Sequence, residues 1–162
     1  MSKIQHVAVI GAGRMGKAIA IAFAYAGLQV KLIDAKVRPE QEFIQYRQQV
    51  QQDLTQELTL LRTIQFVQAE QIAVIQANIQ ILAKLESTKF LTQCDLIMEG
   101  VPEQTQAKQE IFSWLDQYIS PQCIIASTTS TFLVTDIAQM LSHPERVVNA
   151  HWLNPAYLIP VS

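Results

Sequence analysis

Short apolar runs recur along the chain, and each run is about as long as a buried strand. Between them lie longer stretches in which apolar residues recur every three or four positions. Apolar runs without alternation are typical of parallel strands that are covered on both faces. The pattern predicts strands from Val7, before Asp34, over Ile79, Ile81 and Leu82, and in the segments 94–103, 123–127 and 146–150.

The stretches between the runs predict helices. The longest extends from Pro39, near its first turn, to about Arg62. Its apolar stripe consists of Phe43, Tyr46 or Arg47, Val50, Leu54, Leu58 and Leu61. We interpret its Gln-rich faces as solvated, although a helix at this position could also line a substrate cleft. Shorter helices are expected at 68–77, 87–92, 104–118 and from about Phe132, the last capped by Thr131 or a neighbour.

Alternating strands and helices indicate an α/β fold. We predict a Rossmann-type, doubly wound and mostly parallel sheet, with helices on both faces and the long helix inserted after the second strand. A chain of 162 residues is the size of one ordinary domain, so we expect a single domain over residues 1–162.

The segment from Val7 to Asp34 carries the strongest local signal. Gly11 permits a tight turn after the strand, Gly13 leaves room for a pyrophosphate, and Gly16 permits close packing of helix on sheet. The free amides at the helix start face an anion. Glycines that serve only a tight turn are the alternative interpretation. We predict a dinucleotide site whose phosphate-binding turn consists of Gly11, Ala12, Gly13, Arg14, Met15 and Gly16.

Asp34 follows the glycines by about 20 residues, where a carboxylate can accept the hydroxyls of an adenosine ribose. Because that carboxylate repels a 2′-phosphate, the sequence favours NAD over NADP as the cofactor. Lys36 and Arg38 lie close by and leave the choice open.

Composition excludes several other function classes. The net charge is −2 and only 16% of residues are charged, so neither nucleic acid nor a membrane surface is an expected partner. No apolar run is long enough to span a bilayer, and the start resembles no signal peptide, so we expect a cytoplasmic location. Cys94 and Cys123 lack metal-site spacing and are interpreted as reduced core thiols, and no metal site is expected.

Candidate catalytic residues follow the later strands. His151 comes directly after the segment 146–150 and is the expected general base, since imidazole accepts protons near neutral pH. A buried structural histidine is the alternative. Ser130 would bind the substrate hydroxyl or the nicotinamide, unless it only caps a helix. His6 and His143 are expected in solvated or capping roles.

Three blocks together resemble the NAD-binding domain of the 3-hydroxyacyl-CoA dehydrogenase family. They are VIGAGRMGKAIA, EGVPEQTQAKQEIF, and ASTTSTFLVTDIA followed by HPERVVNAHWLNP. The resemblance implies oxidation of an L-3-hydroxyacyl-CoA to the 3-ketoacyl-CoA, or the reverse. It also implies that Glu103 and Lys108 line the nicotinamide half, that Ser130 contacts cofactor and substrate, that His151 is the base, and that Asn154 contacts the cofactor.

The chain departs from the family pattern in three places. Thr128 replaces an Asn, and the Glu that pairs with the catalytic His would fall just beyond Ser162. We also expect the family's helical second domain to be absent from these 162 residues. Without the orienting Glu we expect a chain that binds NAD but turns over slowly or not at all. The apolar segment YLIPV near the carboxyl end suggests self-association, as a homo-oligomer, through an exposed patch.

Two other functions remain open. The segment NPAYLIP equally resembles relatives that act on small 3-hydroxy acids, such as carnitine dehydrogenase and the lambda-crystallin or gulonate dehydrogenase group. The chain could also be a catalytically silent NAD-binding module.

Overall fold

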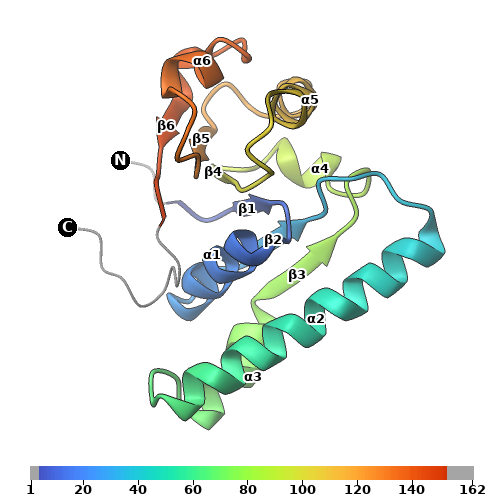
Figure 1. Cartoon of the computed structure of the whole chain (residues 1–162), viewed down its shortest axis with the longest axis vertical. Coiled ribbons are helices and arrows are strands. Elements are labelled where there is room, and N and C mark those ends of the chain that lie inside the picture. The colour runs from blue at the N-terminus through green and yellow to red at the C-terminus, as the bar shows by residue number, and fades with distance from the viewer. Residues whose placement is uncertain (1–3, 153–162) are drawn as a thin grey trace.

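Six parallel strands form one sheet in the order β3-β2-β1-β4-β5-β6. The computed structural model describes residues 4–152 (Figure 1). The strands are β1 (Val7–Ile10), β2 (Val30–Ile33), β3 (Ile79–Leu82), β4 (Leu96–Glu99), β5 (Ile124–Ser127) and β6 (Val147–Asn149). The helices are α1 (Arg14–Tyr25), α2 (Glu40–Thr63), α3 (Ala69–Ala77), α4 (Thr88–Leu91), α5 (Thr105–Leu115) and α6 (Val134–Ala138), with a 3₁₀ turn, η1, at Pro144–Arg146.

The predicted doubly wound sheet is confirmed. Val7 of β1 pairs with Val30 of β2 on one side and with Leu96 of β4 on the other. The strand order therefore reverses beside β1. In open α/β sheets, ligands bind at the carboxyl ends of the strands near such a reversal.

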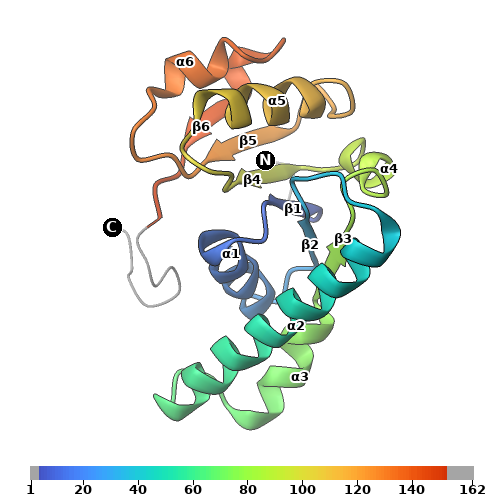
Figure 2. The same ribbon diagram turned by 45° about the vertical axis from the view of Figure 1, so that its right-hand side comes forward.

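Helices cover both faces of the sheet, which explains the continuous apolar runs. Val7 and Val9 pack into a cluster with buried residues of α1, α2 and α3, whereas Ala8 and Ile10 pack with residues of α5 and α6. Figure 2 shows the two groups of helices apart, with α5 beside α6 and α1, α2 and α3 together. Successive side chains of a strand point to opposite faces, so both must be apolar.

The long insertion helix α2 also follows the prediction. Pro39 immediately precedes it, and its buried residues are Phe43, Val50, Leu54, Leu58 and Leu61. Of the two candidates for the second position of the apolar stripe, Tyr46 is half-buried and Arg47 is exposed, so Tyr46 belongs to the stripe. Within the described residues, we find no helix that combines the length and apolarity needed to cross a membrane.

Two predicted helix boundaries are wrong. Helix α5 ends at Leu115 rather than Tyr118, since the Tyr118 amide bonds to the Leu115 carbonyl in a tight turn before Pro121. Helix α6 begins at Val134 without a side-chain cap. The hydroxyl of Thr129 instead accepts the amide of Phe132 at 3.0 Å, which holds the preceding residues in a loop.

Cys94 and Cys123 are free and buried, as expected for core thiols. Burial raises the pKa of both, that of Cys123 to about 12, so each stays protonated at neutral pH.

Close backbone packing joins α1 to the turn that follows β1. Gly11 has a φ of +94°, which is strained for other residues. A Cβ atom on Gly16 would lie 1.8 Å from the Gly11 carbonyl oxygen, whereas one on Gly13 would meet nothing within 4 Å. Gly16 is therefore a packing requirement, and Gly13 is open toward solvent.

We expect Gly16→Ala to lower the free energy of unfolding by about 3 kcal/mol or more, because backbone must move to admit the methyl group. Gly13→Ala is the matched control and should stay within about 1 kcal/mol of the parent. Urea unfolding followed by circular dichroism measures both. Equal stability of the two variants would contradict the packing role of Gly16.

Candidate cofactor site

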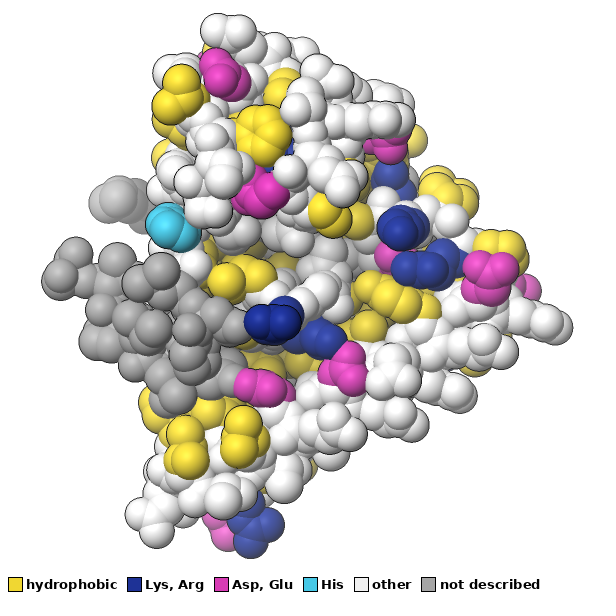
Figure 3. Space-filling model, in the orientation of Figure 1, with side chains coloured by type: hydrophobic (Ala, Val, Ile, Leu, Met, Phe, Trp, Pro, Cys, Tyr) yellow, Lys and Arg dark blue, Asp and Glu magenta, His cyan; other side chains and the backbone are white. Residues whose placement is uncertain are grey.

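A cavity of 460 Å³ lies at the carboxyl ends of the strands, within the range of about 300–1,000 Å³ that is usual for ligand pockets. In Figure 3 hydrophobic side chains form the floor of the hollow on this face, with charged side chains around it. Eight of the residues predicted to be catalytic or cofactor-binding line the cavity: Gly11, Ala12, Gly13, Met15, Asp34, Glu103, Ser130 and His151. Residues from one end of the chain to the other thus meet in a single space.

The glycine turn forms one wall of this cavity. Gly13 precedes α1 with no side-chain cap, so the first amides of the helix point toward open space. Free amides and the positive end of the helix dipole together favour an anion here. Arg14 and Gly16 do not line the cavity; Arg14 is exposed, and Gly16 is buried in the contact described above.

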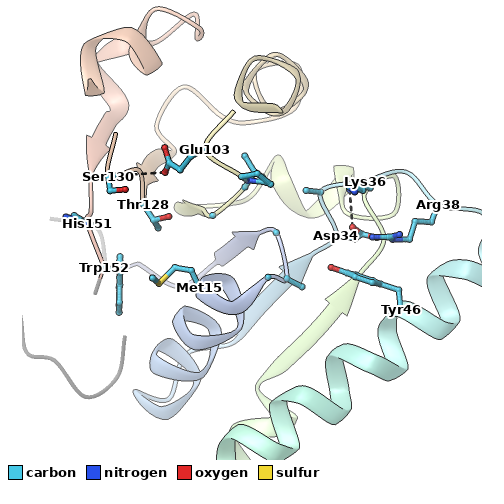
Figure 4. A pocket seen from close by; sticks show the side chains of 17 residues that line it. Met15, Asp34, Lys36, Arg38, Tyr46, Glu103, Thr128, Ser130, His151 and Trp152 are labelled. Atoms are coloured by element: carbon cyan, nitrogen blue, oxygen red, sulfur yellow. Dashed lines mark hydrogen bonds and ion pairs between the residues drawn. The ribbon is translucent and has the colours of Figure 1, made fainter. Parts of the chain in front are cut away.

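Asp34 forms the second anchor. Its side chain is only 2% exposed, and its carboxylate accepts the Lys36 amide at 3.0 Å and the Arg38 Nε–H at 2.6 Å. The guanidinium of Arg38 lies 4.1 Å from the ring centre of Tyr46 (Figure 4). Sequence reasoning noted Arg38 only as a nearby charge and Tyr46 only as a possible core position. Their contact with each other depends on how α2 packs.

Glu103 clamps the loop that carries Ser130. Its carboxylate accepts the Thr129 hydroxyl at 2.7 Å, the Thr131 hydroxyl at 2.6 Å and the Ser130 amide at 3.4 Å. Burial raises the pKa of Glu103, but these hydrogen bonds and the charge of Lys108 outweigh it, so the pKa lies below its usual value. The loop hydroxyls that were expected to cap α6 bind this carboxylate instead.

Lys108 lies beneath the cavity rather than on its wall. It is fully buried, and its Nζ lies 3.0 and 3.1 Å from the two oxygens of Glu99 and 3.9 Å from Glu103. Ser127 also donates to Glu99, at 2.6 Å. In the sequence, Glu99 is only one residue of the predicted strand segment 94–103. The structure makes it the centre of a buried network that joins β4, β5 and α5.

The end of the cavity away from Asp34 is lined by Thr128, Ser130, His151 and Trp152, and Met15 lies beside Trp152 (Figure 4). Ser130 and His151 are exposed to solvent, so both can reach a ligand. Thr128, which departs from the family's Asn, lines the same space. Asn154 and the segment YLIPV lie outside the described residues.

Comparison with known proteins identifies the family. The model of the 3-hydroxyacyl-CoA dehydrogenase NAD binding domain matches residues 6–162. The chain belongs to this family. A probable 3-hydroxybutyryl-CoA dehydrogenase of Bacillus subtilis is 33% identical over 94% of the chain and 50% of the relative. An L-carnitine dehydrogenase/betainyl-CoA thioesterase of a Rhizobium species is 30% identical, over 99% of the chain and 30% of the relative.

A solved structure shows the same fold. The (S)-3-hydroxybutyryl-CoA dehydrogenase of Ralstonia eutropha aligns with a TM-score of 0.83 at 27% identity, over 97% of this chain and 52% of that one. The chain spans about half the length or less of these relatives. NAD is the cofactor of the matched domain.

The buried pair of Glu99 and Lys108 gives a stability prediction. Lys108→Met should lower the free energy of unfolding by about 3–5 kcal/mol, because it leaves a buried carboxylate without its counter-charge. The double variant Glu99→Gln with Lys108→Met should recover much of that loss. Lys89→Met, at an exposed position, is the control and should have little effect. Urea unfolding curves of the four proteins test this, and a fully stable Lys108→Met variant contradicts it.

Proposed function

We propose that this chain is the NAD-binding part of an enzyme that interconverts L-3-hydroxyacyl-CoA and 3-ketoacyl-CoA by hydride transfer. The supporting observation is that Gly11 and Gly13 of the glycine turn line one cavity together with Asp34, Ser130 and His151. Family membership supports the proposed reaction, and the shared cavity supports the proposed roles of these residues.

The cavity fits a dinucleotide. The open space in front of Gly13 leaves room for a pyrophosphate against the α1 amides, and Asp34 would bind the adenosine ribose. Residues of the other end, Met15 and Ser130 among them, would contact the nicotinamide half. Glu103 and Lys108 would support the nicotinamide site, because Glu103 binds the loop of Ser130 and Lys108 lies next to Glu103. Bound NAD supplies the acceptor for the hydride that leaves C3 of the substrate.

His151 would act as the general base, with Ser130 donating to the substrate oxygen. In the oxidative direction, the imidazole takes the hydroxyl proton as the C3–O bond becomes a carbonyl. In the reductive direction, the imidazolium returns that proton to the new alkoxide. Asn154 is proposed as a further cofactor contact from the family resemblance.

A small 3-hydroxy acid is the second candidate substrate. The carnitine dehydrogenase relative supports it, because it matches nearly the whole chain at 30% identity. Acetoacetyl-CoA with NADH, and carnitine with NAD, are the two assays that separate the candidates.

Cofactor binding is tested by calorimetry with NADH. The parent chain should bind, and Gly13→Ala should lose at least about tenfold in affinity, because the added Cβ occupies the space of the pyrophosphate. Its retained fold stability, predicted above, makes the loss interpretable. A folded parent chain that takes up no NADH overturns the proposal.

Catalysis is tested on His151. His151→Gln should lower the rate with acetoacetyl-CoA and NADH by about 10²–10⁴-fold while the Kd for NADH stays within about twofold. His143→Gln is the matched control, since His143 is exposed and pairs with Glu145 at 3.3 Å. An unchanged rate in His151→Gln refutes the assigned base. NADH binding without any turnover, even after a helical second domain of the family is added in trans, favours the silent binding module.

A further inference from the structure

We propose that Arg38 and Tyr46 form the adenine-binding part of the cofactor cleft, with the guanidinium of Arg38 as the surface on which the purine stacks. The inference rests on the NAD binding proposed above and assigns two residues that neither the glycine turn nor the family motifs include. It also gives the insertion helix α2 a part in cofactor binding, because Tyr46 lies on that helix.

The orientation of Arg38 is set on two sides. Its Nε–H donates to Asp34 at 2.6 Å, and its Cζ lies 4.1 Å from the ring centre of Tyr46. A guanidinium is planar, and its Cζ lies over the tyrosine ring, so we infer that one face lies on this ring and that the opposite face is open to another planar group. The side chain is 25% exposed and lines the cavity.

Tyr46 is held where α2 approaches the glycine turn. Burial raises the pKa of Tyr46 and the charge of Asp34 raises it further, while Arg38 and the backbone of Ala12 oppose the shift. The phenol of Tyr46 therefore lies among the carboxylate of Asp34, the guanidinium of Arg38 and the backbone of Ala12 in the glycine turn. In Figure 4 the ring of Tyr46 lies below Arg38 and Asp34, between α2 and the sheet.

The covalent structure of NAD places its adenine at the Asp34 end of the cavity. With the pyrophosphate at Gly13 and the ribose hydroxyls at Asp34, the adenine must extend to the wall of the cavity around Asp34. That wall consists of Ala35, Lys36, Arg38 and Tyr46. Of these, Arg38 and Tyr46 have flat side chains, and the guanidinium of Arg38 lies over the Tyr46 ring. Guanidinium planes stack on aromatic rings and on bases, so Arg38 is the residue that we assign to the purine.

A cation at this place could instead bind the 2′-phosphate of NADP. The geometry favours the base. The Nε–H of Arg38 is already bonded to Asp34, so a phosphate next to Arg38 would also lie next to that buried carboxylate. Repulsion between the two anions opposes NADP, whereas stacking of a neutral purine has no such cost.

Calorimetry on Arg38 variants separates these roles. Arg38→Leu and Arg38→Lys should each weaken binding of NADH and of ADP-ribose by about fivefold or more, since neither side chain offers a planar stacking surface. Binding of reduced nicotinamide mononucleotide, which lacks the adenosine half, should change less than twofold. Arg47→Leu is the matched control: Arg47 follows Tyr46 on α2, its Cζ lies 5.9 Å from the ring centre of Phe43, and it does not line this cavity.

Tyr46 provides an independent variant pair if a change at Arg38 impairs folding. Tyr46→Phe keeps the ring under the guanidinium and should bind ADP-ribose within about twofold of the parent. Tyr46→Leu removes the ring and should bind it at least about threefold more weakly. Thermal unfolding of each variant confirms that the fold is intact.

Several results would overturn the adenine assignment. Parent-like ADP-ribose affinity in Arg38→Lys means that charge alone matters. In a parallel titration with NADPH, a loss of affinity confined to NADPH means that Arg38 binds a 2′-phosphate. An equal loss for the mononucleotide means a general change in the cleft. If the parent binds NADH and the variants match it, this assignment alone fails; if the parent binds neither NADH nor ADP-ribose, NAD binding fails with it.

Discussion

The close contact among the backbones of Gly11, Gly16 and Gly100, at the end of the central strand β1, positions the elements around the cavity. Gly11 and Gly16 approach each other so closely that no Cβ fits on Gly16, and the Gly100 amide bonds to the Ile10 carbonyl at 3.0 Å. A Cβ on Gly11 would lie 3.0 Å from the Gly100 oxygen. Helix α1 and strand β4 are thereby drawn against the end of β1. The cavity lies at this junction, where the strand order reverses.

The two ends of the cavity are made rigid by different interactions. At one end, the buried carboxylate of Asp34 orients Arg38, which in turn rests on Tyr46. At the other end, Glu103 gathers the hydroxyls of Thr129 and Thr131. At each end, a carboxylate accepts hydrogen bonds from neighbouring side chains that line the cavity or adjoin it. These side chains are therefore held in place before a ligand binds. Sites held in this way need less ordering on binding.

The buried pair of Glu99 and Lys108 supports the second end from below. The lysine bonds Glu99 directly and lies 3.9 Å from Glu103, so it links the core of the sheet to the loop of Ser130. Such a pair is costly to bury, and its value lies in the geometry that it imposes rather than in net stability. The end of the cavity that carries Ser130 therefore rests on buried side chains, Glu99, Lys108 and Ser127, that do not line the cavity.

Much of the fold could be predicted from local pattern. Continuous apolar runs gave the strands because both faces of a parallel sheet are covered, and the stripe from Phe43 to Leu61 gave α2 because only one face of that helix packs. The wrong prediction of a cap for α6 concerns a side chain that has two possible hydrogen-bond partners. Thr131 was expected to cap a helix, but its hydroxyl binds Glu103, which lies 28 residues away in the chain.

By itself, the sequence determined the order of strands and helices, the glycine turn with its acid, and membership in the family, because these depend on spacing along the chain. Only the tertiary structure decided that Lys108 is buried beneath the cavity and that Tyr46 supports Arg38. Whether a lysine faces a ligand or a buried carboxylate depends on which distant segment packs over it. Contacts between residues that are far apart in the chain produce no periodic pattern in the sequence. They can be identified only when the packing of helices on the sheet is known.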